Sequence, residues 1–488
     1  MQTSERKKVF WEYLIIACIV SACNVLFCFH RIYSLGLIGI EIGWLMVQFM
    51  RGKVADYVAY FAIFMCNCLE YTTFTGEDTF YSLKNTRIYG INLGIILLLP
   101  VFIWAVFHLR KISKVKLNKA SCFSLGLIAI NIVAAVVGLM LILANDNNIT
   151  VLGNVFFLYL EKAYSMIFLP MAFILAFAIL VRERDYSIYK IGLALQATLW
   201  ANVFQMLTSL VSGIRGSYGA LVTMQISILN FLVPFLILLY FYRKEVIYPR
   251  MTVVIGAIGS TLAVLFNSNG KLILMAAICS LLFWYLGMRE GSFFMKLFTL
   301  LALIFLIPAV SFILTYISQN PLFAAKFNDV KLLLNVFDAD WLQNLSASPR
   351  VRVEEFRDMF LEFAEKPWLI LTGKGYLGSI QDHTGYFYTH LASNDGFCSD
   401  AEWAHGIFYA LHEIVSYILM YGVMGILFMA VFLKDAVSLF FRERNIWILI
   451  GAYWFFMFCG YSFTVSTFGC LALLYGLYTS EMKHEVIE

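Results

Sequence analysis

Apolar segments about 20 residues long recur along the chain from Phe10 to Ser480, separated by short polar or charged turns. An α-helix needs about 20 mostly apolar residues to cross the hydrocarbon core of a bilayer. Hydrophobic residues make up 61% of the 488 residues and charged residues only 14%. This composition lies outside the range of soluble domains. The sequence therefore predicts an all-α polytopic membrane protein.

We expect about 14 transmembrane helices. They are expected at residues 10–29, 33–50, 54–74, 89–109, 121–144, 163–181, 190–212, 218–242, 251–266, 271–288, 294–317, 412–433, 445–463 and 465–480. Residues 1–317 would hold the first eleven spans, 318–411 one long and mostly helical loop, and 412–488 the last three spans and a short tail.

The placement of lysine and arginine predicts the orientation, because basic residues in short loops tend to stay on the cytoplasmic side. With the N-terminus inside, 22 Lys and Arg residues fall on the cytoplasmic side. Only 6 fall in short outer turns, and 7 lie in the long loop, where the rule has little force. Both termini are therefore expected in the cytoplasm, with residues 318–411 outside.

Ionisable residues are scarce inside the expected spans. Glu41 is the only carboxylate near the middle of one. An intramembrane acid is a functional candidate, but a structural group that is hydrogen-bonded to another helix is the favoured interpretation. Ion-coupled carriers commonly gather polar sites and broken helices at the midplane, and the sequence shows no such set of ionisable residues.

The long loop contains a predicted amphipathic helix that begins at Ser348 and Pro349 and ends before Pro367. At 100° per residue its apolar and charged side chains separate onto opposite arcs. The apolar arc holds Val353, Phe356, Met359, Phe360, Phe363 and Ala364, and the opposite arc holds Glu354, Glu355, Asp358, Glu362, Glu365 and Lys366. We expect the apolar arc to be buried.

Three arginines on this helix are candidates for anion binding. Arg350 and Arg357 lie at the border of the two arcs, whereas Arg352 falls inside the apolar arc. A guanidinium turned toward a buried face needs an anion, and its planar fork suits phosphate. A salt bridge to a loop carboxylate, or snorkelling along the membrane surface, explains the position equally well. The loop has 7 basic and 12 acidic residues, so we expect no nucleic-acid partner.

A glycine-rich turn follows the helix in "LTGKGYLGS", with Gly373, Gly375 and Gly378 spaced as G-x-G-x-x-G. A dinucleotide-binding role requires a strand–turn–helix context that a loop between spans lacks. The glycines would instead let the backbone turn tightly or approach a ligand. The sequence shows no His and Cys spacing typical of a metal site, and we expect no metal and no cofactor.

Three segments occur in an order that resembles the O-antigen ligase and O-antigen/exopolysaccharide polymerase superfamily of bacterial membrane glycosyltransferases. They are "NSNGKLILMAAI" at the outer end of a span, "RVEEF" with "EKPWLILTGKGY" in the long loop, and "HEIVSYILMYGVMG" opening the next span. The resemblance covers roughly residues 260–430, and each motif is short.

The resemblance assigns roles to individual residues. Lys271 takes the basic position, Arg352 the loop arginine, Gly373 and Gly375 the glycine turn, and His412 the histidine. Phe356 replaces a tryptophan, Glu413 replaces an asparagine, and the spacing from His412 to Gly422 is one residue short. His405 is therefore the reserve for the histidine role. Arg215, at another outer turn, joins the basic set or is a solvated turn residue.

The resemblance also implies a GT-C-like fold and a reaction in the bacterial inner membrane. The donor would be an oligosaccharide on polyprenyl diphosphate and the acceptor a sugar hydroxyl. Lys271, Arg352 and Arg215, with Arg350 and Arg357 next, would offset the diphosphate charge, and His412 or a loop carboxylate would act as general base. A polymerase of repeat units is favoured, working with a flippase and a chain-length regulator. A ligase to lipid A core, a lipid-linked sugar transporter and a non-catalytic assembly partner are the alternatives.

Overall fold

The computed structural model describes part of the chain in detail. The described residues are 3–27, 30–68, 82–83, 86–112, 119–144, 147–182, 187–213, 246–267, 293, 296–297, 328–329, 331–334, 340–390, 400–409, 411–443, 445–451 and 463–485. The expected spans at 218–242 and 271–288, and most of 294–317, lie outside them. Arg215 and Lys271 lie outside them as well.

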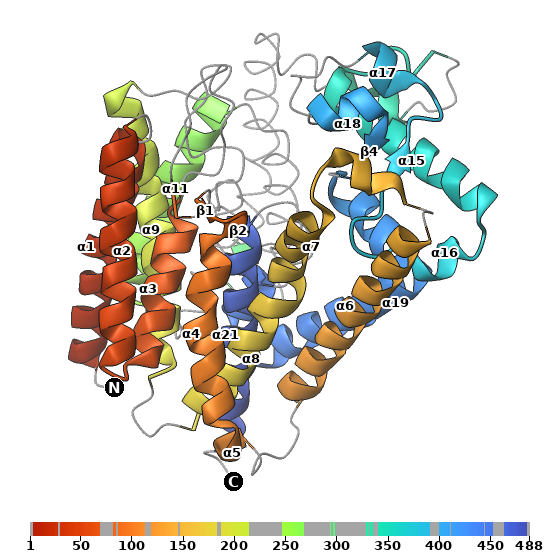
Figure 1. Cartoon of the computed structure of the whole chain (residues 1–488). Helices are drawn as coiled ribbons and strands as arrows, with labels where there is room; N and C mark the ends of the chain where they lie inside the picture. The colour runs from red at the N-terminus through yellow and green to blue at the C-terminus, as the bar shows by residue number, and fades with distance from the viewer. Residues whose placement is uncertain are drawn as a thin grey trace.

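Most of the described apolar segments form a bundle of long and short helices (Figure 1), and the strands form two separate two-stranded pairs. The bundle contains α1 (Thr3–Leu26), α2 (Arg31–Met50), α3 (Val54–Cys66), α4 (Leu93–Phe107), α8 (Leu169–Leu180), α9 (Tyr189–Ser212), α11 (Pro249–Asn267) and α21 (Phe463–Glu485). Helix α9 packs against α1 and α3. These helices overlap the expected spans because each is apolar around most of its circumference.

The long helix α6 (Lys119–Leu143) and several shorter elements connect this bundle to a separate group of helices. The shorter elements are the strands β1 (Arg87–Ile88) and β2 (Ile91–Asn92), the helices α5 (Leu109–Ile112) and α7 (Val155–Ala163), the 3-10 turn η1 (Asn148–Leu152) and the π-helical turn η2 (Tyr164–Phe168). Strands β1 and β2 pair antiparallel, with Arg87 opposite Asn92. Helix α6 runs up to the segment expected as the outer loop.

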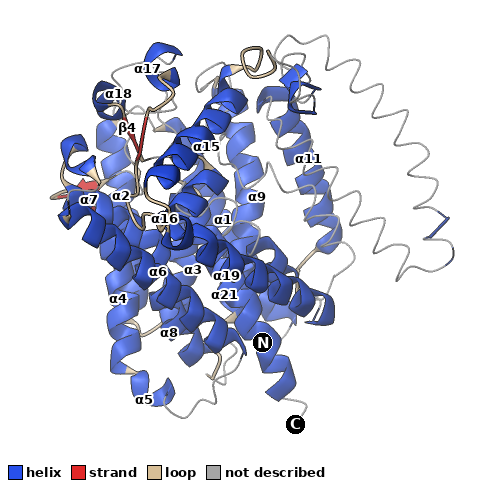
Figure 2. Ribbon diagram, turned by 90° about the vertical axis from the view of Figure 1, so that its right-hand side faces the viewer, coloured by secondary structure: helices blue, strands red, loops and turns tan. Residues whose placement is uncertain are grey.

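The described part of the expected loop forms a small helical domain. It contains α15 (Ala347–Glu365), α16 (Leu369–Thr372), β3 (Ile380–Gln381), α17 (Tyr386–His390), α18 (Asp400–His405) and β4 (Ile407–Phe408), and the chain continues into α19 (Glu413–Glu443). Strands β3 and β4 pair antiparallel, with Ile380 opposite Phe408. The domain core packs on Leu141 of α6 and on Val415 and Leu419 of α19. Figure 2 shows that these elements are almost entirely helical.

Membrane embedding is supported by helix length and composition. Within the described ranges, three helices are long and apolar enough to cross a bilayer, at Ser4–Leu26, Arg31–Met50 and Leu125–Leu143. The two halves of α19, Val415–Phe428 and Ala430–Glu443, meet at 42° and make a fourth if they form one span. The protein is therefore an all-α membrane protein, and the total of about 14 spans remains a prediction.

Buried polar side chains connect the bundle helices. Asn67 accepts a hydrogen bond from Ser21 Oγ at 3.0 Å, and its backbone carbonyl accepts one from Gln205 Nε2 at 2.8 Å. Glu41 is buried against neighbouring helices, as expected. Its Oε1 atom, however, accepts no hydrogen bond from the described part of the chain, so the predicted hydrogen bond to another helix stays a prediction.

The polarity of α15 differs from the prediction. Glu354, Glu355 and Asp358, predicted on the solvated arc, are at most 2% exposed, whereas Phe360 of the apolar arc is 60% exposed. Met359 and Phe363 are buried as predicted. The acids point inward because the folded domain supplies donors for them: Asp358 accepts from the backbone N–H of Thr384 at 3.0 Å. A helical wheel contains no information about such donors.

The ends of the bundle allow a test of topology. Figure 1 places both chain termini at one end and α17 and α18 at the other. If the basic turns are cytoplasmic, single cysteines at positions 388 and 405 of a cysteine-depleted protein should react with an impermeant thiol reagent in intact cells. Cysteines at 53 and 110, in exposed basic turns, should react only after lysis. Labelling of position 53 in intact cells would contradict the orientation.

Candidate functional site

The glycine turn of the outer domain contacts α19 at a second irregularity, which lies within the Val415–Phe428 half of this helix. Gly422 interrupts this helix with φ 60° and ψ −161°. A break leaves carbonyl groups of the preceding turn without intrahelical donors. The backbone N–H groups of Lys374 and Gly375 donate to the carbonyls of Leu419 and Met420, the second at 3.1 Å. The turn therefore completes the hydrogen bonding of the broken helix.

Glycine is required at both predicted turn positions. Gly373 and Gly375 have φ values of 66° and 69°, which L-residues rarely adopt. A Cβ atom on Gly373 would lie 2.6 Å from the carbonyl oxygen of Leu419, and one on Gly375 would lie 2.3 Å from that of Ala134 in α6. Of the two predicted roles, the tight turn is observed, and the close approach is to the chain's own backbone.

A buried polar network holds the same turn against both long helices. Asn131 of α6 is fully buried, and its Oδ1 atom accepts hydrogen bonds from Tyr376 at 3.0 Å and from Tyr421 of α19 at 2.6 Å. Lys374, between the two glycines, pairs with Glu362 of α15 and donates to the carbonyl of Ser379 at 2.7 Å. These bonds fix the outer domain against the middle of α6 and the first third of α19.

His412 and Glu355 form a buried pair beside this junction. His412 precedes α19 and is 7% exposed, and Glu355 lies on α15 and is 2% exposed. His412 Nδ1 lies 2.8 Å from Glu355 Oε1, and the histidine backbone N–H donates to Glu355 Oε2 at 3.2 Å. A carboxylate at Nδ1 favours the tautomer that carries its hydrogen there. Nε2 is then the proton-accepting nitrogen of the neutral ring.

The three arginines of α15 have different surroundings. Arg357 donates to Glu354 Oε2 at 2.8 Å, and Arg350 Nε lies 3.7 Å from Glu354 Oε1 with its guanidinium over the Tyr386 ring. The charges of both are thus offset by one buried carboxylate. Arg352 is partly exposed and lies one turn before Glu355 on the same helix. Arg352 thus lies on the turn of α15 that precedes the Glu355–His412 pair.

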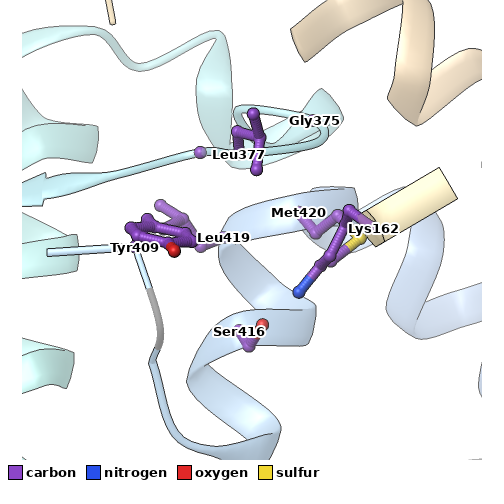
Figure 3. A pocket seen from close by; sticks show the side chains of 8 residues that line it. Lys162, Gly375, Leu377, Tyr409, Ser416, Leu419 and Met420 are labelled. Atoms are coloured by element: carbon purple, nitrogen blue, oxygen red, sulfur yellow. The ribbon is translucent and has the colours of Figure 1, made fainter. Parts of the chain in front are cut away.

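A small pocket borders the same turn of α19 (Figure 3). It has room for only about one water molecule and is partly open to solvent. Figure 3 shows the amino group of Lys162 beside Ser416, and the glycine turn and Tyr409 complete the walls. The backbone N–H of Ser416 donates to the His412 carbonyl at 3.0 Å, so the pocket lies one helical turn from the histidine. An ammonium and a hydroxyl group at its wall suit an anion.

Sequence analysis missed Glu355 and Lys162. Glu355 was assigned to a solvated arc, and its spacing of 57 residues from His412 carries no local signal. Lys162 lies at the end of α7, and its position in a short outer segment was the only available indication. His405, the reserve histidine, is exposed at the end of α18. No set of three or more His, Cys, Asp or Glu residues among the described ones is arranged to hold a metal.

Another buried acid lies along α15. Burial raises the pKa of the Asp358 carboxyl to about 6, the hydrogen bond from Thr384 opposes this rise, and the charge of Asp382 adds to it. Protonation of Asp358 is therefore favoured by folding, and its contribution to stability is present below about pH 4 and lost as the pH rises through about 6.

Alanine substitutions test the glycine turn. Gly385→Ala provides the matched control, because Gly385 has φ 69° and no atom within 4 Å of an added Cβ. The control substitution should lower the free energy of unfolding by about 1 kcal/mol through conformational strain alone. Gly375→Ala adds overlap with the α6 backbone and should lower the free energy of unfolding by about 1–3 kcal/mol more. Thermal unfolding in detergent measures both, and equal melting temperatures would contradict the close approach.

Comparison with known proteins adds no assignment to this geometry: the sequence matches no protein-family model and no curated protein.

Proposed function

We propose that the protein is a glycosyltransferase of the bacterial inner membrane that joins oligosaccharide repeat units carried on polyprenyl diphosphate. The observation that supports this most is the His412–Glu355 pair. It unites two separate segments of the motif resemblance, the "RVEEF" helix and the "HEIVSYILMYGVMG" span. A carboxylate-oriented histidine at the end of a membrane helix is suited to general base catalysis.

The reaction needs a base at the acceptor. In the proposed step, His412 Nε2 takes the proton of the acceptor hydroxyl as its oxygen bonds to the anomeric carbon of the donor. Glu355 holds the imidazole in place and stabilises its positive charge, as a carboxylate does in other acid–base–nucleophile systems. The bond between the anomeric carbon and the diphosphate oxygen breaks, and the diphosphate leaves with the electron pair. A single displacement of this kind inverts the anomeric centre.

The reaction also needs positive charge at the leaving group. Arg352 on α15 and Lys162 on α7 are proposed to supply part of it. Fixed cations placed where negative charge develops stabilise the transition state in a site shielded from water. Lys271 and Arg215 are proposed to add to this set on the basis of the motif order. Arg350 and Arg357, already offset by Glu354, are proposed to position the helix.

Substitution of the pair gives the first test. His412→Ala should lower the rate of glycosyl transfer by about 10²- to 10⁴-fold through loss of the base. Glu355→Gln should lower it less, because the histidine keeps a neutral hydrogen-bond acceptor. Glu365→Gln, at an exposed position of α15, is the matched control and should leave the rate unchanged. Turnover of purified protein in nanodiscs measures all three, and normal turnover of a folded His412→Ala protein would refute this role.

The product distribution distinguishes the polymerase from its alternatives. Purified protein given only a polyprenyl-diphosphate repeat unit should produce a ladder of lipid-linked oligomers, because a polymerase uses one molecule as both donor and acceptor. A ligase would leave this substrate unchanged until lipid A core was added. A transporter would move it across vesicles without altering its mass. Absence of a ladder from folded, donor-binding protein would rule out the polymerase.

A further inference from the structure

The outer domain carries a strip of large apolar side chains on its surface. We define this apolar strip as Phe360 and Leu361 of α15 with Trp368, Ile370 and Leu371 of the α16 segment. Each is between 42% and 60% exposed. Isolated exposed apolar residues are ordinary, but a contiguous group of this size usually contacts a partner or a membrane.

The polarity of α15 indicates which environment the strip faces. Its acids Glu354, Glu355 and Asp358 are buried, while Phe360 and Leu361 point away from the domain core. A helix at a water-facing surface has the opposite arrangement. The apolar exterior at Phe360 and Leu361 is suited to hydrocarbon, where polar groups must find partners within the protein, and the exposed side chains of Arg357 and Glu365 flank it. The inward acids have such partners in Thr384, His412 and Arg357.

The strip continues into the outer surface of α19, whose two halves form a candidate membrane span. The backbone of Leu371 approaches Gly422 of α19 so closely that a Cβ there would lie 2.6 Å from the Leu371 carbonyl. Beyond Gly422, Met424 and Leu427 of α19 are exposed by 62% and 58%. Both views place α16 beside α19, and in Figure 1 it lies below α17 and α18 and level with the bundle helices. The exposed apolar surface of α19 therefore extends onto the outer domain.

The residues next to the strip suit the boundary between hydrocarbon and water. Trp368 has an amphipathic ring of the kind enriched at both membrane interfaces. Lys366, two residues earlier, is partly buried, and a lysine stem can lie along apolar surface while its ammonium group reaches the headgroups. Glu365, one turn after Leu361, is an exposed charged residue at the edge of the strip.

We propose that the apolar strip is inserted into the outer leaflet, so that α16 and the end of α15 form a lipid-contacting foot of the outer domain. The partner is the lipid surface itself. This inference rests on the membrane embedding of α19 and not on the proposed enzymatic function. It places the opposite face of α15, which holds Glu355 and contacts His412, directly above the headgroups of the leaflet.

Quenching of a fluorescent label by brominated lipids tests whether the apolar strip is inserted into the outer leaflet. The environment-sensitive dye NBD is attached to single cysteines at positions 361, 371, 388 and 424 of a cysteine-depleted full-length protein in nanodiscs. Position 424 on α19 is the lipid-exposed reference, and position 388 on α17, which is 62% exposed, is the water-exposed reference. Lipids with brominated acyl chains should quench labels at 361 and 371 at least half as strongly as the label at 424, with matching blue-shifted emission. The label at 388 should not respond.

Two outcomes would overturn the proposal. Labels at 361 and 371 that emit like the label at 388 would show that the strip faces water. Blue-shifted emission without quenching by brominated lipid, together with cysteine cross-linking between copies at position 371, would show that a second chain covers it. Melting temperatures equal to that of the cysteine-depleted parent establish that each labelled protein is folded. Glycosyl transfer is not measured, so failure of the proposed function would leave this result unaffected.

Discussion

The arrangement of the outer domain depends on backbone hydrogen bonds between its glycine turn and the broken helix α19. Gly422 interrupts the helix, and the N–H groups of Lys374 and Gly375 bond to the carbonyls of Leu419 and Met420. A buried carbonyl without a donor costs about 1–3 kcal/mol, so the break and the turn stabilise each other. Only glycine permits this contact, because a Cβ at either turn position would overlap another backbone.

This junction explains how distant segments meet. The glycine turn is bound to both α6 and α19 through Ala134, Asn131 and Met420, which sets the position of α15 relative to the start of α19. Glu355 is thereby brought to both the ring and the backbone of His412. Lys162 reaches the same region from α7 and lines the pocket below the turn. The candidate site is therefore a product of the docking of the domain rather than of any single motif.

Helix α15 connects the candidate site to the proposed membrane foot. Three of its acids, Glu354, Glu355 and Asp358, face the domain interior, where they accept backbone N–H groups or pair with cations, and part of its apolar arc faces outward. The two faces of the helix therefore have different proposed roles. One face carries Glu355 to the histidine, and the other would hold the domain at the height where the head of a lipid-linked substrate lies.

The sequence by itself determined the class of protein and much of the helix map. Runs of apolar residues predicted α1, α2 and α6 as spans because helix length and hydropathy are local properties. Local signals likewise predict α15 and the glycine turn, the motif order points to His412, and both helix geometry and motif order point to Arg352. The predicted helix start differs by two residues from the structure: α15 begins at Ala347, and its N-cap is Ser346 rather than Ser348.

Only the tertiary structure decided which face of α15 is buried and which residues form the site. A helical wheel separates apolar from charged residues, but it cannot show that Thr384 and His412 provide donors for buried acids. Nor can it show that Glu355 finds a histidine 57 residues away, or that the two glycines face backbone instead of a ligand. These features depend on contacts between segments far apart in the chain, and local sequence patterns contain no record of such contacts.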